Sequence, residues 1–270
     1  MHHSNTPYDW TIFQLDKNFS VREIMTIIRE LIFASDLTEA KDLSGKYDYD
    51  IIPIGDSTNF HSYYERTNNI IKAIAKEDLL SIDTGIASLL SCLVRREFYS
   101  ILERNHIAGF VNRSDLNKLI SFLPIYITSL HAESAMRMYF RQQQLANLVN
   151  YETFLKNQFA EISKVVEKNG LNKSLDFVTL NDKFEKAKKI GFYTDIYDEL
   201  EFWQELALYY SLNGKLIGQI DWDKIKDYKE IRNRTMHMKD QLSYSNTKED
   251  LEQLLRFLYE CNKIINEIFT

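Results

Sequence analysis

Near its C-terminus the chain carries the segment Arg232-Asn233-Arg234-Thr235-Met236-His237, whose residue types could act on a phosphate group. The imidazole of a histidine can accept or release a proton near neutral pH. The planar guanidinium of an arginine matches the oxygen atoms of a phosphate and stabilises negative charge that develops on them. The segment therefore predicts a site for proton transfer beside an anion, if Arg232 and His237 reach the same substrate.

A helix over Trp222–Lys239 would divide these residues between two sides. At about 100° per residue, Asn233 and His237 share the polar side, whereas the side expected to face the core carries Ile225, Tyr228, Ile231, Thr235 and Met238. An incidental surface histidine is therefore the alternative interpretation of His237. Arg232 and His237 point about 140° away from each other on a regular helix. For both side chains to reach one substrate, the helix must be distorted, the arginine must reach around it, or the same motif of a second subunit must complete the site.

Arg232, Asn233, three intervening residues and His237 resemble the Arg-polar-x-x-x-His motif of the HEPN superfamily. Proteins of this superfamily are helical bundles, many of them metal-independent endoribonucleases, with the motif at the start of the final helical hairpin. The motif here lies on an expected helix that is followed by one long amphipathic helix. The resemblance covers about the last 150 residues and does not explain the N-terminal half.

The resemblance implies RNA cleavage that leaves 2′,3′-cyclic phosphate ends, with no metal and no cofactor. By this resemblance His237 acts as a general base or acid, and Arg232 stabilises the phosphorane-like transition state. Asn233 orients the phosphate or the imidazole. Because two motifs commonly meet across a dimer in this family, we expect a homodimer. A role as a toxin or in antiviral defence, with an antitoxin or sensor protein as a possible partner, is also implied.

One position departs from the family pattern. Members paired with nucleotidyltransferase antitoxins often carry a tyrosine two residues after the histidine, whereas this chain has Lys239 there. The departure argues against control by tyrosine adenylylation and leaves the ribonuclease chemistry untouched.

The charge of the chain limits how it could bind RNA. A net charge of −6 argues against a broad basic surface, so any contact with nucleic acid must be local. The stretch Trp222–Lys239 is the basic one, and Lys229 and Arg234 are candidate contacts to the RNA backbone. A solvated helix face with mixed charges is the other interpretation of this stretch.

Composition predicts an all-α fold. Only 8 Gly and 3 Pro in 270 residues leave few turn signals, which favours long helices joined by short loops. We expect an N-terminal helical region of unknown role over residues 1–112 and a HEPN-like antiparallel helical bundle over residues 113–270. In the first region the predicted helices are Val21–Lys41, Asn59–Lys76 and Leu79–Asn105, with a loop or short hairpin arm at Lys46–Gly55 and a loop at Asn105–Ser114.

The second region is expected to be helical throughout. One helix follows Asp115 and is kinked or ended by Pro124, and another continues to about Leu148. Further predicted helices are Tyr151–Asn169, Asn181–Ile190, Asp195–Leu212, Trp222–Lys239 and Lys248–Phe269. The last of these carries apolar residues in heptads, which indicates a packing seam of a bundle.

Three other observations limit the function. Cys92 and Cys261 lack metal-binding or redox spacing, and no signal peptide or membrane-spanning run is visible, so we expect a cytoplasmic protein without a membrane partner. A metal-dependent helical enzyme would need clustered ligands, and both His131-Ala132-Glu133 and Glu103-Arg104-Asn105-His106 are better interpreted as surface polar groups. A non-catalytic HEPN-like interaction or scaffold module remains the main alternative to the ribonuclease.

Overall fold

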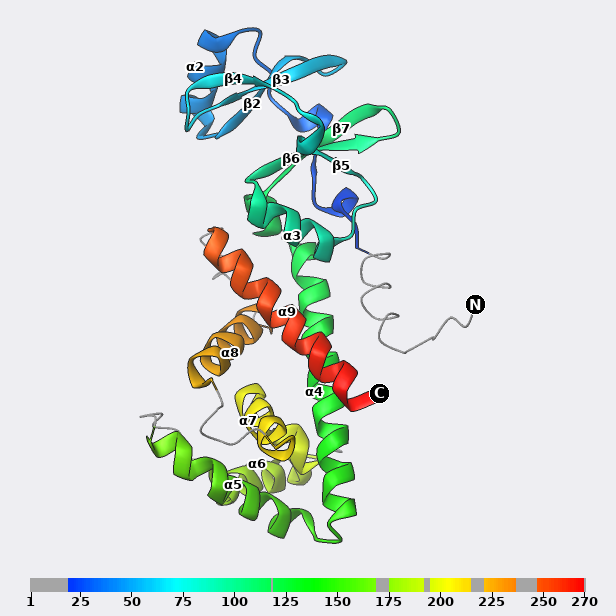
Figure 1. Ribbon diagram of the computed structural model, residues 1–270, viewed down its shortest axis with the longest axis vertical. Helices are drawn as coiled ribbons and strands as arrows, with labels where there is room; N and C mark the ends of the chain where they lie inside the picture. Colours follow the sequence, from blue (N-terminus) through cyan, green and yellow to red (C-terminus); the bar gives the residue numbers. More distant parts are fainter. Residues whose placement is uncertain are drawn as a thin grey trace. The chain divides into compact units, whose positions relative to one another are not determined.

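The computed structural model describes residues 19–117, 119–168, 175–191, 195–214, 221–236 and 247–269 (Figure 1). Contacts divide these residues into two compact units. The N-terminal unit comprises residues 19–124 together with 247–255, and the helical unit comprises residues 125–236 together with 256–269. Each unit is described by itself.

The N-terminal unit contains two β-sheets, so the prediction of an all-α chain with an N-terminal helical region is wrong. One sheet has the strand order β1-β7-β6-β5, with β5 parallel to β6 and the other pairs antiparallel. Its strands are β1 (Thr26–Ile27), β5 (Leu79–Ser81), β6 (Phe98–Glu103) and β7 (His106–Asn112). The other sheet is the antiparallel meander β2 (Ile51–Asp56), β3 (Asn59–Glu65) and β4 (Ile70–Ala73).

Two complete helices, several short turns and the first turns of two longer helices also belong to this unit. Helix α2 (Leu37–Tyr47) begins at Asp36, whose side chain caps the backbone N–H groups of Thr38 and Glu39, and α3 (Ile86–Arg95) precedes β6. The 3₁₀ turns are Val21–Glu23, Ile28–Glu30, Lys76–Asp78 and Arg113–Asn117. Figure 1 shows α2 beside the sheet of β2, β3 and β4, where Ala40 of the helix shares a buried cluster with Ile52 and Tyr64.

Local backbone features show where the predicted helices of this unit are interrupted by turns and strands. Asn69 has a φ of 55° between β3 and β4, and Arg104 has a φ of 58° between β6 and β7, so both residues turn the chain where a helix would continue. The predicted helix Asn59–Lys76 is thus a hairpin, and Leu79–Asn105 holds β5, α3 and β6. The expected loop Asn105–Ser114 is mostly the strand β7. The predicted helix Val21–Lys41 contains two 3₁₀ turns and β1 before α2 begins.

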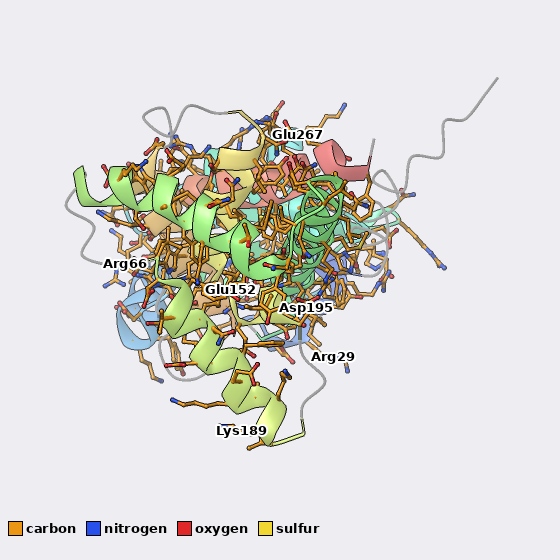
Figure 2. All side chains as sticks on the ribbon, turned by 90° about the horizontal axis from the view of Figure 1, so that it is seen from below. Arg29, Arg66, Glu152, Lys189, Asp195 and Glu267 are labelled. Atoms are coloured by element: carbon orange, nitrogen blue, oxygen red, sulfur yellow. The ribbon has the colours of Figure 1, made fainter. Side chains whose placement is uncertain are left out.

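The elements described from residue 119 onward are helices. They are α4 (Leu119–Ala146), which continues through Pro124, then α5 (Tyr151–Lys168), α6 (Phe177–Lys189), a 3₁₀ turn at Ile196–Glu199, α7 (Phe202–Leu212), α8 (Trp222–Met236) and α9 (Lys248–Phe269). In Figure 1, α5, α6 and α7 lie beside the C-terminal part of α4. The exposed faces of α5 and α6 carry charged residues such as Glu152 and Lys189 (Figure 2).

Helix α7 forms the centre of the helical unit. Eight of its residues are buried, including Trp203, Leu206 and Tyr209, so the helix is enclosed on all sides rather than along one stripe. Tyr209 packs edge-on against Tyr139 of α4, with ring centroids 5.8 Å apart. Because this central helix also contains a carboxyl group, Glu205, the core of the unit includes a buried ionisable group.

Candidate functional site

Helix α8 carries the described part of the Arg-Asn-x-x-x-His segment. Its residues Ile225, Tyr228, Ile231 and Thr235 are buried, which confirms the predicted core-facing side. The tyrosine hydroxyl donates to the backbone carbonyl of Arg256 at 3.2 Å, and this bond ties α8 to α9. His237, Met238 and Lys239 lie outside the described residues.

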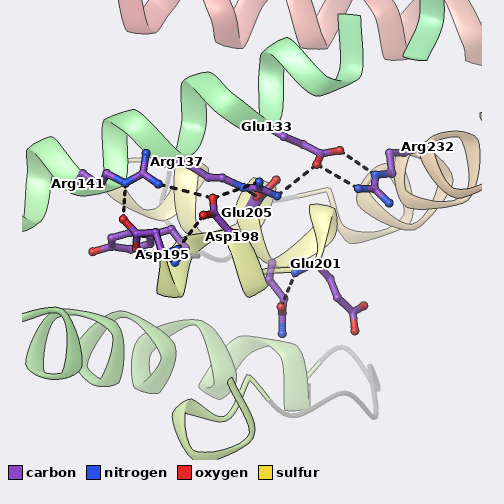
Figure 3. A network of polar contacts seen from close by, with 10 residues as sticks. Glu133, Arg137, Arg141, Asp195, Asp198, Glu201, Glu205 and Arg232 are labelled. Atoms are coloured by element: carbon purple, nitrogen blue, oxygen red, sulfur yellow. Dashed lines mark hydrogen bonds and ion pairs between the residues drawn. The ribbon is translucent and has the colours of Figure 1, made fainter. Parts of the chain in front are cut away.

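Arg232 forms a bidentate ion pair with Glu133 of α4 (Figure 3). Its Nε donates to Glu133 Oε1 at 2.7 Å and its Nη2 donates to Oε2 at 3.1 Å. The glutamate side chain is only 3% exposed and the arginine side chain is 21% exposed. Hydrogen bonding to Glu133 raises the pKa of Arg232, so the guanidinium keeps its charge at any physiological pH.

The ion pair belongs to a longer network on one side of α4. Arg137, one turn after Glu133, donates to Glu133 Oε2 at 3.3 Å, to Glu205 Oε1 of α7 at 2.5 Å and to Asp198 at 3.4 Å. One turn further, Arg141 donates to Asp195 at 2.6 Å. Figure 3 shows these side chains in a row, with Arg232 at one end and Arg141 at the other.

Glu205 is the most buried group of the network. Its carboxyl is fully enclosed, and this burial raises its pKa to about 8 in spite of the opposing effect of Arg137. Its Oε2 atom has no hydrogen-bond partner among the described residues. A negative charge on that oxygen would therefore be poorly compensated, which is the physical reason that the neutral form persists to such a high pH.

The other predicted site residues occupy less distinctive positions. Asn233 is half-buried on α8. Lys229 donates to Glu201 at 3.2 Å and lies 5.9 Å from the ring centroid of Trp203, and Arg234 forms an ion pair with Glu230 one turn before it. Both predicted RNA contacts are thus partly neutralised by neighbouring carboxylates. Their contact with RNA stays a prediction.

Sequence reasoning missed the acidic half of this site. Glu133 was interpreted as a surface polar group beside His131, and this interpretation is wrong for Glu133 because its side chain is buried against two arginines. His131 is exposed. A usable signal was present for Glu205, because a lone charged residue within the otherwise apolar run of α7 can be buried only with a charged partner.

A cavity of about 500 Å³ lies in the N-terminal unit. Five carboxyl groups line it: Glu30, Asp48, Asp50, Glu97 and Asp115. Three aromatic rings (Tyr49, Phe98 and Phe110) and the single arginine Arg113 also line it. Asp115 is held in place by Thr26 Oγ1, which donates to it at 3.3 Å, and by the backbone N–H of Asn112 at 2.8 Å.

In the parts of the chain that the structure describes, no group of three or more His, Cys, Asp or Glu side chains is placed to hold a metal ion. None of the described helices combines the length and the apolar character that crossing a membrane requires.

Comparison with known proteins yields few similarities. No protein-family model matches the chain. No curated protein matches it either. Among solved structures, the CBS domain of the bacterial CNNM/CorC family Mg²⁺ transporter in complex with ATP is similar at 17% identity and a TM-score of 0.34, over 43% of this chain and 96% of that one. The same domain in complex with the inhibitor IGN95a gives 18% identity and a TM-score of 0.32, over 40% of this chain and 78% of that one. Because identity and TM-score are this low, no statement about the present chain follows from the likeness.

Proposed function

We propose that the helical unit is a metal-independent endoribonuclease of the HEPN toxin or defence type, which cleaves RNA to 2′,3′-cyclic phosphate ends. In this proposal His237 moves the proton of the attacking 2′-hydroxyl or of the leaving oxygen. Arg232 stabilises the phosphorane-like transition state, and Asn233 orients the phosphate or the imidazole. The motif resemblance supports these roles, and the reaction uses no cofactor.

The observation that carries the proposal is the fixed orientation of Arg232. Two of its N–H groups are bound by Glu133, while the Nη1 amino group has no partner within the described residues. A guanidinium that is already oriented stabilises charge developing on a phosphate without reorganising during the reaction. A solvated arginine at a helix end would lack this advantage.

The proposed active form is a homodimer in the cytoplasm, where Cys92 and Cys261 remain free thiols. Because Arg232 and His237 point apart on a regular helix, the same motif of a second subunit would complete the site. Lys229 and Arg234 would guide the RNA backbone, and an antitoxin or sensor protein would control access to it.

The test is RNA cleavage by the purified chain in EDTA. We expect products with 2′,3′-cyclic phosphate ends, and we expect His237→Ala to abolish cleavage while the circular dichroism spectrum and the melting temperature stay unchanged. A dimer mass in light scattering is expected from the parent chain. Equal cleavage by parent and variant would rule out His237 as the proton-transfer group, and full activity from a monomer would rule out the shared site.

A non-catalytic HEPN-like interaction module is the second candidate, and one observation favours it. Arg232, Lys229 and Arg234 each pair with a carboxylate of the chain, which lowers the positive charge available to RNA. This candidate is preferred if the parent chain does not cleave RNA of mixed sequence, or if the His237→Ala variant cleaves it equally well.

The cavity of the N-terminal unit favours a separate binding function for that unit. Its volume suits a small organic ligand, its carboxylates accept hydrogen bonds from hydroxyl and amino groups, and its rings stack on a planar group. A nucleoside has all of these features. Adenosine at millimolar concentration should raise the melting temperature of the parent chain. Tyr49→Ala should reduce that rise, because it removes a ring that lines the cavity. The ring is half-exposed, so its loss should disturb the fold little. An unchanged melting temperature of the parent would reject this function.

A further inference from the structure

The network around Arg232 has a direction, from a buried anchor to a partly exposed end. Glu205 is fully buried and binds Arg137, Arg137 binds Glu133, and Glu133 binds Arg232. Three consecutive contacts thus connect the centre of α7 to the motif arginine on α8. All four side chains belong to the helical unit, and Figure 3 shows them in this order.

We propose that Glu133 is a positioning residue of the ribonuclease reaction: it fixes the Arg232 guanidinium so that its Nη1 edge faces the substrate phosphate. This role rests on the proposed function of the motif. Glu133 does not touch the substrate and acts only through Arg232.

Two features of the contact give Glu133 this ability. Its two oxygens bind Nε and Nη2 of Arg232, which fixes both the place and the plane of the guanidinium. The carboxylate itself cannot turn freely, because Oε2 also accepts from Arg137 and because the whole group is 3% exposed. A surface ion pair between two solvated side chains would have neither constraint.

The arrangement also has a cost for substrate binding. A carboxylate so close to the guanidinium partly cancels its positive charge, and it repels an approaching phosphate. Glu133 should therefore weaken the binding of RNA while it improves the geometry of the reaction. A residue that only stabilises the fold would not change these two quantities in opposite directions.

The decisive variant is Glu133→Gln, which keeps the size of the side chain and removes its charge. We expect kcat to fall by about 10- to 100-fold, since misplacement of a reacting group by about 1 Å can cost up to about 100-fold, and we expect KM to decrease. In a chain that already carries Arg232→Ala, the same Glu133→Gln change should have no further effect on kcat. Glu152→Gln, which removes an exposed ion pair with Lys156 on α5, is the matched control and should leave both constants unchanged.

The outcomes separate the two claims. If the parent chain has no His237-dependent cleavage, the proposed function is overturned and this role with it. If the parent cleaves RNA, two results overturn the role of Glu133 alone. One is an unchanged kcat in Glu133→Gln. The other is a further fall in kcat of the same size when Glu133→Gln is added to a chain that already carries Arg232→Ala. Should Glu133→Gln fail to fold, Glu133→Asp is the variant that decides, because it keeps the charge but shifts the position of Arg232. Its effect on kcat should likewise be absent in a chain that already carries Arg232→Ala.

Discussion

Replacing Glu205 with glutamine should stabilise the helical unit at neutral pH, although the Glu205 carboxyl group accepts a hydrogen bond from Arg137. Burial raises the pKa of Glu205 to about 8 from an ordinary 4.5, so the folded chain holds a proton that the unfolded chain releases. The contribution of this group to stability is complete below pH 4.5 and is lost as the pH rises towards 8. Glutamine resembles the protonated form at every pH, and its amide oxygen can accept the hydrogen bond of Arg137 Nε.

The magnitude follows from the two pKa values. Each pH unit between 4.5 and 8 removes up to about 1.4 kcal/mol from the free energy of unfolding of the parent chain. Over the whole interval the ceiling is roughly 5 kcal/mol, and at pH 7 it is roughly 3 kcal/mol. The variant should have no such slope.

Urea unfolding between pH 5 and pH 8, followed by tryptophan fluorescence, measures this difference. Trp203 and Trp222 are both buried in the helical unit, so their fluorescence follows the unfolding of that unit. Parent and Glu205→Gln should coincide near pH 5 and diverge as the pH rises, whereas the control Glu152→Gln should keep the slope of the parent. A variant that is less stable than the parent at pH 7 would refute the reasoning, because it would mean that Glu205 is ionised and bound to Arg137 in the folded chain.

Two further predictions concern other parts of the fold. Gly109→Ala should destabilise the N-terminal unit by about 1–3 kcal/mol or more, because its Cβ would lie 2.3 Å from the backbone oxygen of Thr26 in the paired strand β1. Gly45→Ala is the matched control, since its Cβ meets nothing within 4 Å on α2, and it should stabilise the unit by roughly 0.5–1 kcal/mol. Hydrogen exchange of peptides from β6 and β7 should be faster in Gly109→Ala than in Gly45→Ala. Equal protection in both variants would contradict the close approach of β1. Tyr210→Phe should cost the helical unit about 1.5–3 kcal/mol, because the hydroxyl donates to the buried carboxylate of Glu260 at 2.7 Å. A loss below about 0.5 kcal/mol in urea would show that Lys224 and Lys263 satisfy that carboxylate without the hydroxyl.

The sequence was most informative where the hydrophobic pattern is regular. The last helix was predicted at Lys248–Phe269 and lies there, and the core-facing side of α8 was predicted from Ile225, Tyr228 and Ile231. In these helices the apolar residues recur at the helical period for three turns or more, so the period alone decides the element and its buried side.

The same reasoning failed in the N-terminal unit because its strands are short and its turns lack glycine and proline. Asn68-Asn69 and Arg104-Asn105 reverse the chain without a glycine. The pattern therefore predicts a helix for the β3–β4 hairpin, and the end of a helix followed by a loop for the β6–β7 hairpin. The boundary between α3 and β6 is marked only by charged residues, Arg95, Arg96 and Glu97. A count of glycine and proline in the whole chain therefore says little about strand content when asparagine and arginine occupy the positions with positive φ.

For the candidate site, the sequence supplied the arginine but not the carboxylates that hold it. Glu133 and Arg232 are 99 positions apart, and their ion pair is a long-range contact between α4 and α8 that no local pattern encodes. This contact also shows that the orientation of Arg232 and the placement of His237 are separate questions. A second subunit was invoked because Arg232 and His237 point apart on one helix, yet Arg232 is already oriented within its own chain. A dimer is therefore not needed to hold the arginine, and its remaining role in the proposed reaction would be to bring the histidine to it.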